Sequence, residues 1–341
     1  MKLKTTLSII GDLRLTYLTP FTTKKLFQPI AEDLFFSDGW GDEATLTKLK
    51  DPKTVEGPAK PIQITWKERS RPGLIERTGR FQSPLHRFLP DESKQALVRL
   101  YLPKKYDTKT PLCLVFPMTG DQGFGHREKT FALPLIKKGI GTVILINPFY
   151  GRRRPASQKT FVAKTVQDIL AMCLAASEEG RSLLQYFRNE GFQNLGVAGV
   201  SQGGMLAAIV GAKAPFPVAI SSSLAPHSPE VIFTEGLIKG LVDWKALGMQ
   251  PGKQATEKFR DLFQMGSIDQ LPKPLASHAV FLQGAKRDLV VPKHSVQRVH
   301  EVWEGASLNW LPGTHLTSLS LHTRSFRDSV VKSFEAFTAS V

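Results

Sequence analysis

Short apolar runs without charged residues recur along the chain, at residues 112–116, 142–146 and 195–198. Continuous runs of this kind are typical of strands that are buried on both faces of a sheet. Residues 61–66 and 96–102 instead alternate apolar and polar positions, which predicts two antiparallel strands paired with each other. Further strands are predicted at residues 218–222, 279–283 and 308–311.

Between these runs the apolar residues take helical spacing, around residues 129–138 and from 161 through 187, and an amphipathic helix is predicted at 324–337. A pair of edge strands followed by alternating strands and helices is typical of a doubly wound, mostly parallel sheet. The pattern therefore predicts an α/β fold.

The length of 341 residues suits one such domain, at residues 61–341, preceded by an N-terminal arm at residues 1–60 that packs on it. Residues 226–275 are too many for a simple crossover, and Leu237, Leu241 and Trp244 have helical spacing. We interpret this segment as a helical cap insertion over the rim of the sheet, and a purely structural insertion remains open.

The chain is basic, with 45 Lys and Arg against 30 Asp and Glu and a formal charge of +15. Such a charge favours an anionic partner, such as an acidic membrane surface or a phosphorylated substrate. Nucleic acid is not expected, because no helix-turn-helix, zinc or aromatic RNA-binding motif accompanies the charge. The apolar runs are too short to span a membrane, so a soluble or peripheral protein is expected.

Two features of the sequence bear on location. Cys113 and Cys173 lie in apolar runs, which predicts buried free thiols and is compatible with a reducing, intracellular compartment. The first thirty residues hold one acid, Asp12, and lack a signal-peptide core. They fit an organellar presequence or a basic, membrane-facing arm, with an ordinary helix as the alternative. Their cations are Lys2, Lys4, Arg14, Lys24 and Lys25.

The strongest chemical motif is the segment Gly199 to Gly203, which reads Gly-Val-Ser-Gln-Gly and follows the apolar run at 195–198. This is the pattern of a nucleophile elbow, a sharp strand-to-helix turn that exposes a serine hydroxyl at the top of a sheet. Positions two before and two after the serine need glycine, since the backbone there comes too close for a Cβ. Ser201 is the predicted nucleophile.

A serine nucleophile of this type predicts an acid and then a histidine, each in a loop after a later strand. Asp288 follows the run at 279–282 and His315 follows the run at 308–311. His315 would take the Ser201 proton, and Asp288 would fix the imidazole tautomer. His227, at the start of the insertion, is the alternative base or a substrate contact.

An oxyanion hole is expected beside Ser201. One donor is the backbone amide of Gln202, the residue after the nucleophile, and another comes from the loop after the strand at 112–116. Thr119 and Gly120 are the candidates in that loop. This chemistry requires neither a metal ion nor a cofactor.

Further motifs make the chain resemble the α/β-hydrolase domain-containing protein 18 family, and the likeness spans nearly the whole sequence. The resemblance implies an α/β-hydrolase fold with a helical cap, and a serine hydrolase that uses Ser201, Asp288 and His315. The family is also associated with mitochondria and with acyl chemistry on phospholipids. The motifs are Thr119-Gly120-Asp121, Asn147-Pro148-Phe149-Tyr150-Gly151 with Arg153 and Pro155, Phe233-Thr234-Glu235-Gly236 with Trp244, Asp288 with Pro292, and Trp303 upstream of Gly313 and His315.

The loop after residues 142–146 shares the carboxyl edge of the sheet with the elbow, so Tyr150 and Arg153 are predicted substrate contacts. Arg153 would bind a phosphate or carboxylate of an anionic acyl substrate. A structural bond from Arg153 to a carboxylate such as Asp168 is the alternative. The sequence thus predicts hydrolysis of acyl esters, of lipids or phospholipids, through an acyl-enzyme. A thioesterase, a small-ester esterase and a non-catalytic scaffold remain open.

Overall fold

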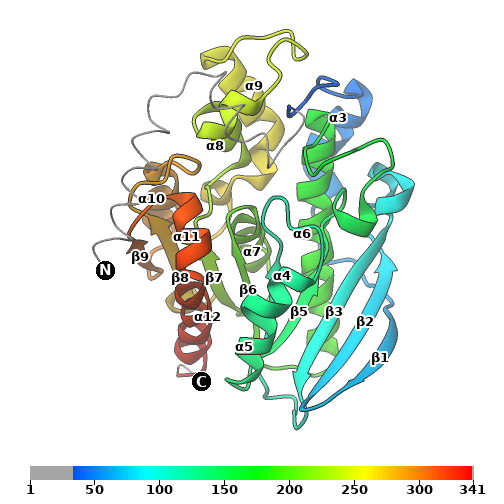
Figure 1. Cartoon of the computed structure of the whole chain (residues 1–341), viewed down its shortest axis with the longest axis vertical. Helices are drawn as coiled ribbons and strands as arrows, with labels where there is room; N and C mark the ends of the chain where they lie inside the picture. Colours follow the sequence, from blue (N-terminus) through cyan, green and yellow to red (C-terminus); the bar gives the residue numbers. More distant parts are fainter. Residues whose placement is uncertain (1–33, 340–341) are drawn as a thin grey trace.

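A nine-stranded sheet runs through the centre of the computed structural model, which describes residues 34–339 (Figure 1). The strand order is β1-β2-β3-β5-β4-β6-β7-β8-β9. Pairs among β1, β2, β3 and β5 are antiparallel, and every other pair is parallel. The predicted mostly parallel sheet is confirmed. The strands are β1 Thr65–Arg71, β2 Leu74–Gln82, β3 Gln95–Pro103, β4 Leu112–Phe116, β5 Gly141–Leu145, β6 Leu195–Val200, β7 Ala219–Ser223, β8 Val280–Ala285 and β9 Ser307–Leu311.

The expected pairing of residues 61–66 with 96–102 is wrong. β2 lies between β1 and β3 and pairs with both of them. The hydrophobic pattern does not predict β2, because this strand is rich in charged residues. One of them, Glu76, is only 1% exposed and lies within ion-pair distance of Arg71 and Arg99.

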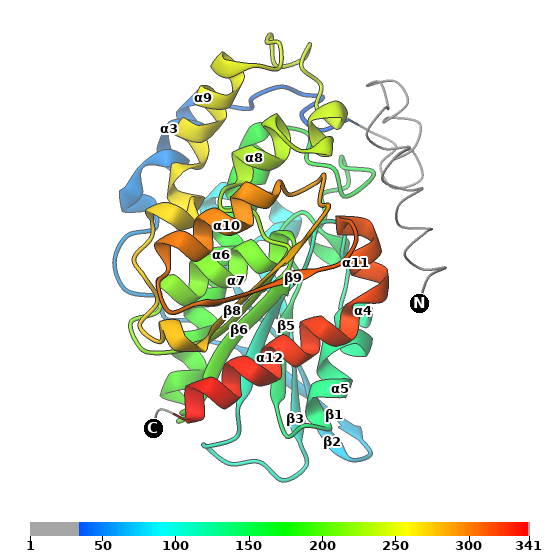
Figure 2. The ribbon, with the colours of Figure 1, turned by 90° about the vertical axis from the view of Figure 1, so that its left-hand side faces the viewer.

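Helices cover both faces of the sheet (Figure 2). Side chains of β4 alternate between two apolar clusters: Leu114 belongs to the cluster under α6, α7 and α10, and Val115 belongs to the cluster under α5 and α12. A strand buried on both faces needs apolar residues at every position, which explains the continuous run. The helices are α5 Leu133–Ile136, α6 Val166–Asn189, α7 Gln202–Ala212, α10 Lys293–Val302 and α12 Thr323–Thr338.

The segment between β7 and β8, called the insertion below, forms α8 Pro229–Thr234, a 3-10 turn at Leu237–Leu241, and α9 Lys253–Phe263 at the top of Figure 1. The arm joins it: the Phe35 amide donates to the Leu241 carbonyl at 2.8 Å, and the Trp40 ring lies 5.3 Å from that of Phe259. Helix α3, Glu43–Lys50, follows in the arm. The predicted presequence or basic arm lies outside the described residues.

The two cysteines are free and buried, as predicted. Between residues 34 and 339, none of the helices has both the length and the apolar content that crossing a bilayer needs.

Two further short helices are α4 Gly125–Arg127 and α11 His315–Leu321, and a π-helical turn at Glu128–Ala132 follows α4.

Candidate active site

Ser201 occupies the sharp turn between β6 and α7. Its backbone has φ 57° and ψ −125°, a region that residues with a side chain rarely adopt. The turn leaves no room for a side chain at positions 199 and 203. A Cβ at Gly199 would overlap the Gly203 carbonyl, and a Cβ at Gly203 would lie 2.6 Å from the Phe116 carbonyl oxygen. The glycine spacing in the sequence therefore has a steric cause, and the turn carries the Ser201 hydroxyl to the edge of the sheet.

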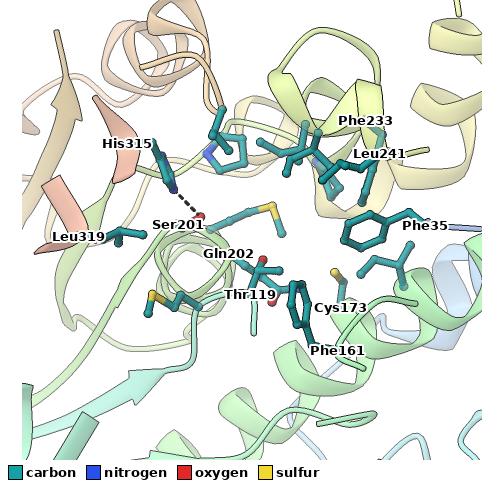
Figure 3. Close-up of a pocket in the computed structure, with 18 of the residues that line it drawn as sticks. Phe35, Thr119, Phe161, Cys173, Ser201, Gln202, Phe233, Leu241, His315 and Leu319 are labelled. Atoms are coloured by element: carbon teal, nitrogen blue, oxygen red, sulfur yellow. Dashed lines mark hydrogen bonds between the residues drawn. The ribbon is translucent and has the colours of Figure 1, made fainter. Parts of the chain in front are cut away.

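The structure brings Ser201, Asp288 and His315 together. Asp288 lies three residues after β8, and His315 is the first residue of α11, just after β9. Nε2 of His315 lies 3.1 Å from Oγ of Ser201 (Figure 3), and Nδ1 of His315 lies 2.8 Å from Oδ2 of Asp288. Both Asp288 and His315 are buried, so this chain of hydrogen bonds is shielded from bulk water.

The second oxygen of Asp288 is also fixed. Its Oδ1 accepts the backbone amides of Val290 and Val291 at 2.9 and 2.8 Å. The carboxylate is thereby held in one orientation, with Oδ2 facing the imidazole. Since a carboxylate accepts, Nδ1 of His315 carries a proton and Nε2 presents its lone pair to the Ser201 hydroxyl.

Two of the three predicted oxyanion donors lie beside Ser201. Gln202 and Thr119 both line the pocket above the serine (Figure 3). Gln202 is the first residue of α7, so its amide has no acceptor inside the helix. Gly120 is not among the lining residues. It has a φ of +82° and forms the bend of the loop beneath the Phe161 ring.

Tyr150 lies behind this loop and does not line the pocket. Burial raises the pKa of Tyr150, while hydrogen bonds from the Gly120 amide and the Thr119 hydroxyl partly oppose that rise. The Tyr150 hydroxyl also lies 3.5 Å from Oε1 of Gln202. The predicted substrate contact is therefore wrong for Tyr150, which instead touches both segments that carry the oxyanion candidates.

The pocket above Ser201 has a volume of about 160 Å³. Its polar lining residues are Thr119, Ser201, Gln202 and His315 (Figure 3), and no Lys, Arg, Asp or Glu of the described chain lines it. The remaining wall is aliphatic, aromatic or sulfur-containing. It consists of Phe35, Met118, Phe161, Ile169, Cys173, Met205, Pro226, Pro229, Ile232, Phe233, Ile238, Leu241, Val290, Leu316 and Leu319.

The sequence does not identify this wall as a site. Its residues come from the arm, the loops after β4 and β8, the loop before α6, the insertion, and helices α6, α7 and α11, and each of them fits an ordinary core position when considered alone. Cys173 is an example: burial raises the pKa of its thiol to about 12. The thiol therefore stays protonated and serves as a small apolar wall residue.

Arg153 does not reach the pocket, and its predicted contact with an anionic substrate is wrong. Its guanidinium donates to both carboxylate oxygens of Glu179 at 2.6 and 2.8 Å, and the side chains of both residues are fully buried. Further bonds run to the carbonyls of Ile146 and Ser93. The alternative partner, Asp168, instead caps the start of α6. The adjacent acids Glu178 and Glu179, which follow the apolar stretch at residues 169–176 of α6, were the available signal.

His227 also lies away from Ser201. Its Nδ1 lies 2.7 Å from Oγ of Ser295, and it does not line the pocket. Burial lowers the pKa of His227, which favours a neutral ring near pH 7. Within residues 34–339, no cluster of three or more His, Cys, Asp or Glu side chains is placed to hold a metal ion.

Comparison with known proteins gives a family and a fold. The model of a family described as alpha/beta hydrolase domain containing 18 matches residues 33–263 and 249–336. Similar solved structures include a cold-adapted esterase from an Arctic intertidal metagenomic library, with a TM-score of 0.53 and 14% identity over 80% of this chain and 99% of that chain. Acetyl xylan esterase 1 from Thermoanaerobacterium sp. JW/SL YS485 has a TM-score of 0.54 and 13% identity over 91% and 98%. At these identities the likeness shows the α/β-hydrolase fold alone.

Proposed function

The chain belongs to the alpha/beta hydrolase domain containing 18 family. From this membership and the geometry around Ser201, we propose that it hydrolyses carboxylic esters through an acyl-enzyme. The observation that carries the proposal is the 3.1 Å contact between Nε2 of His315 and Oγ of Ser201, on a ring held by Asp288.

The steps follow from this arrangement. Oγ of Ser201 attacks the ester carbonyl carbon while its proton passes to Nε2 of His315. The amides of Gln202 and Thr119 stabilise the negative carbonyl oxygen of the tetrahedral intermediate. Collapse of the intermediate expels the alcohol, which takes the proton from His315. Water, deprotonated in turn by His315, then attacks the acyl carbon. The bond from that carbon to Oγ of Ser201 breaks, the acid leaves, and Oγ takes the proton back from His315.

The apolar wall supports a lipid-like acyl ester as the substrate. A hydrocarbon chain gains about 0.8 kcal/mol for each methylene it buries in such a pocket. A sugar ester, the substrate class named for the acetyl xylan esterases, would find no polar partner along this wall. Because no cation among residues 34–339 lines the pocket, we expect the phosphate of a phospholipid to stay at the rim, where the exposed Lys239 follows the lining residue Ile238.

A fluorophosphonate probe tests the chemistry directly. We expect it to label the wild-type protein, to fail on Ser201→Ala and His315→Ala, and to label Ser157→Ala normally, because Ser157 is an exposed serine outside the pocket. A folded wild-type protein that takes no label would favour the scaffold alternative. Parallel assays on an oxygen ester and on the thioester of the same acid separate an esterase from a thioesterase.

Peripheral contact with an anionic membrane is part of the same proposal and is supported by the charge of +15. We expect the protein to sediment with vesicles that contain anionic phospholipid and to remain in solution with neutral ones. A mitochondrial location is tested by cell fractionation. Lipid extracts from cells that carry wild-type protein or Ser201→Ala would then show which acyl species accumulates when turnover stops.

A further inference from the structure

The turn after β5, at residues 147–153, packs against the loop at residues 117–123, which follows β4. The Gly151 amide donates to Oε1 of Gln122 at 2.9 Å, and a Cβ at position 151 would overlap the Gln122 carbonyl. Phe149 has a φ of 64°, a conformation that residues with a side chain rarely adopt. Strain of this kind persists only where the surroundings hold it, and it is concentrated at functional sites. The question is what this strained turn serves.

Buried polar contacts hold the turn in place. Oγ of Ser93 accepts the Phe149 amide at 2.9 Å and donates to the Arg153 carbonyl at 2.5 Å. The Arg153 guanidinium is fixed in turn by Glu179 and by the Ser93 carbonyl. None of these side chains lines the pocket. What they orient is Tyr150, the residue after Phe149.

The Tyr150 hydroxyl lies between the two segments expected to bind the oxyanion. Tyr150 is 1% exposed, and its oxygen accepts the Gly120 amide and the Thr119 hydroxyl. Burial raises the pKa of Tyr150, so the hydroxyl stays protonated and can donate to Oε1 of Gln202, 3.5 Å away. One hydroxyl therefore joins the loop after β4 to the first residue of α7.

These bonds bear on the oxyanion donors in two ways. The Gly120 amide is already bonded to Tyr150, which leaves the Thr119 amide as the donor in that loop. On the other side, the Gln202 side chain is held between Tyr150 and the Cys173 thiol. Oxyanion donors act best when their positions are fixed before the reaction, and a displacement of about 1 Å can lower a rate about a hundredfold.

We propose that Tyr150 is a positioning residue for ester hydrolysis, whose hydroxyl holds Thr119 and Gln202 at the separation at which their amides bind the oxyanion. The inference rests on the proposed hydrolysis and adds a residue that acts through the two donors. Tyr150 does not line the pocket, so it touches no substrate there. The buried pair of Arg153 and Glu179 supports it by holding the turn that carries Tyr150.

Tyr150→Phe tests the proposal, because it removes the hydroxyl and keeps the ring. We expect kcat for p-nitrophenyl butanoate to fall about ten- to a hundredfold and KM to stay within about threefold, since the oxyanion forms only after the substrate has bound. Tyr186→Phe is the matched control and should keep its kcat. Tyr186 is half-buried, its hydroxyl accepts Nε1 of Trp66 at 3.2 Å, and it does not line the pocket.

Hydrogen exchange tests the contact without any turnover. Removing the Tyr150 hydroxyl frees the Gly120 amide. Its exchange, followed by mass spectrometry in peptides over residues 117–123, should accelerate at least about fivefold in Tyr150→Phe. Tyr186→Phe should exchange there like the wild type.

Trifluoromethyl hexyl ketone reports on the oxyanion itself. Oγ of Ser201 adds to its carbonyl carbon, the Ser201 proton passes to Nε2 of His315, and the alkoxide that forms occupies the oxyanion site. In Tyr150→Phe the ketone should bind at least about tenfold more weakly. The pKa of the bound hemiketal, read by fluorine NMR, should rise, which a general loss of stability would not cause.

A folded Tyr150→Phe protein that keeps its kcat would overturn the proposal. So would one that loses kcat while the Gly120 amide and the ketone behave as in the wild type, and so would equal losses in Tyr186→Phe. If Tyr150→Phe does not fold, Gln202→Met removes the acceptor and keeps the backbone amide. It should lower kcat and ketone affinity together, and a loss of neither refutes the role of Tyr150. A wild-type protein that neither hydrolyses the ester nor binds the ketone, but whose Gly120 amide responds to Tyr150→Phe, counts against the ester hydrolysis alone.

Discussion

Replacing Asp288 by Asn should disable the imidazole while changing the shape of the site very little. Oδ1 of Asp288 accepts two backbone amides, those of Val290 and Val291. The Asn carboxamide must therefore turn its oxygen toward these amides, which places its NH2 against Nδ1 of His315. Nδ1 then has to accept, so the imidazole proton moves to Nε2, the atom that must receive the Ser201 proton.

The size of the loss follows from the energy needed to rotate the amide. In the productive orientation the NH2 group would face both backbone donors, and each unsatisfied buried donor costs about 1–3 kcal/mol. The total of about 2–6 kcal/mol leaves the productive form at roughly one part in 30 to one part in 20,000. The same replacement in serine proteases lowers kcat about 10⁴-fold, which lies inside that range.

The assay is the kcat for p-nitrophenyl butanoate at neutral pH, with thermal unfolding as the measure of folding. Asp91→Asn is the matched control, because the Asp91 side chain is 90% exposed and outside the site. KM should change little, since the defect concerns proton transfer in the transition state. Asp288→Asn protein that unfolds like the wild type and keeps more than about a third of its kcat would refute this account of His315.

Three further predictions concern residues around the site. Gly203→Ala should distort the elbow, lower kcat and destabilise the fold by about 1–3 kcal/mol in urea unfolding. Gly125→Ala is the control, because a Cβ has open space there, and it should leave kcat and stability unchanged. Equal behaviour of the two variants would contradict the steric argument. Arg153→Met should lower the free energy of unfolding by about 3–5 kcal/mol, because Glu179 stays buried and loses its partner. The ratio of kcat/KM between anionic and neutral esters should not change. A changed ratio would restore Arg153 as a substrate contact. Burial raises the pKa of Asp168. The stability that its protonated form contributes is therefore present below about pH 3.9 and is lost as the pH rises through the folded-state pKa. We expect the free energy of unfolding of Asp168→Asn, relative to wild type, to grow between about pH 4 and pH 7, and a constant difference would argue against the shift.

Local sterics and strand topology explain why the elbow and its two partners were predictable. The spacing of Gly199 and Gly203 around Ser201 reflects backbone contacts within five residues, so a short motif contains the whole constraint. Asp288 and His315 follow apolar runs that are parallel strands in the structure, and loops after such strands meet at one edge of the sheet.

Residues whose environment depends on distant partners were not predictable in the same way. Arg152, Arg153 and Arg154 look alike in the sequence, and only Arg153 is buried, because a short 3-10 turn directs it toward Glu179 on α6. The partner lies 26 residues away. Strand β2 was not predicted for a related reason. Its Glu76 can be buried only because arginines lie beside it, and a hydrophobic pattern assigns those arginines to the surface.

The residues around Ser201 and the apolar wall of the pocket come from different parts of the fold. Ser201, Asp288 and His315 follow β6, β8 and β9, and β7 and β8 lie between the outer two. With strands about 4.8 Å apart, β6 and β9 are separated by roughly 14 Å, so His315 meets Ser201 only because the loop after β9 and the start of α11 fold back over the sheet edge. That placement depends on the sheet, whereas Phe35 and Phe233, which face the pocket, belong to the arm and the insertion (Figure 3). If the pocket holds the acyl group as proposed, changes in these outer segments alter which acyl group fits and leave the contact between Ser201 and His315 intact.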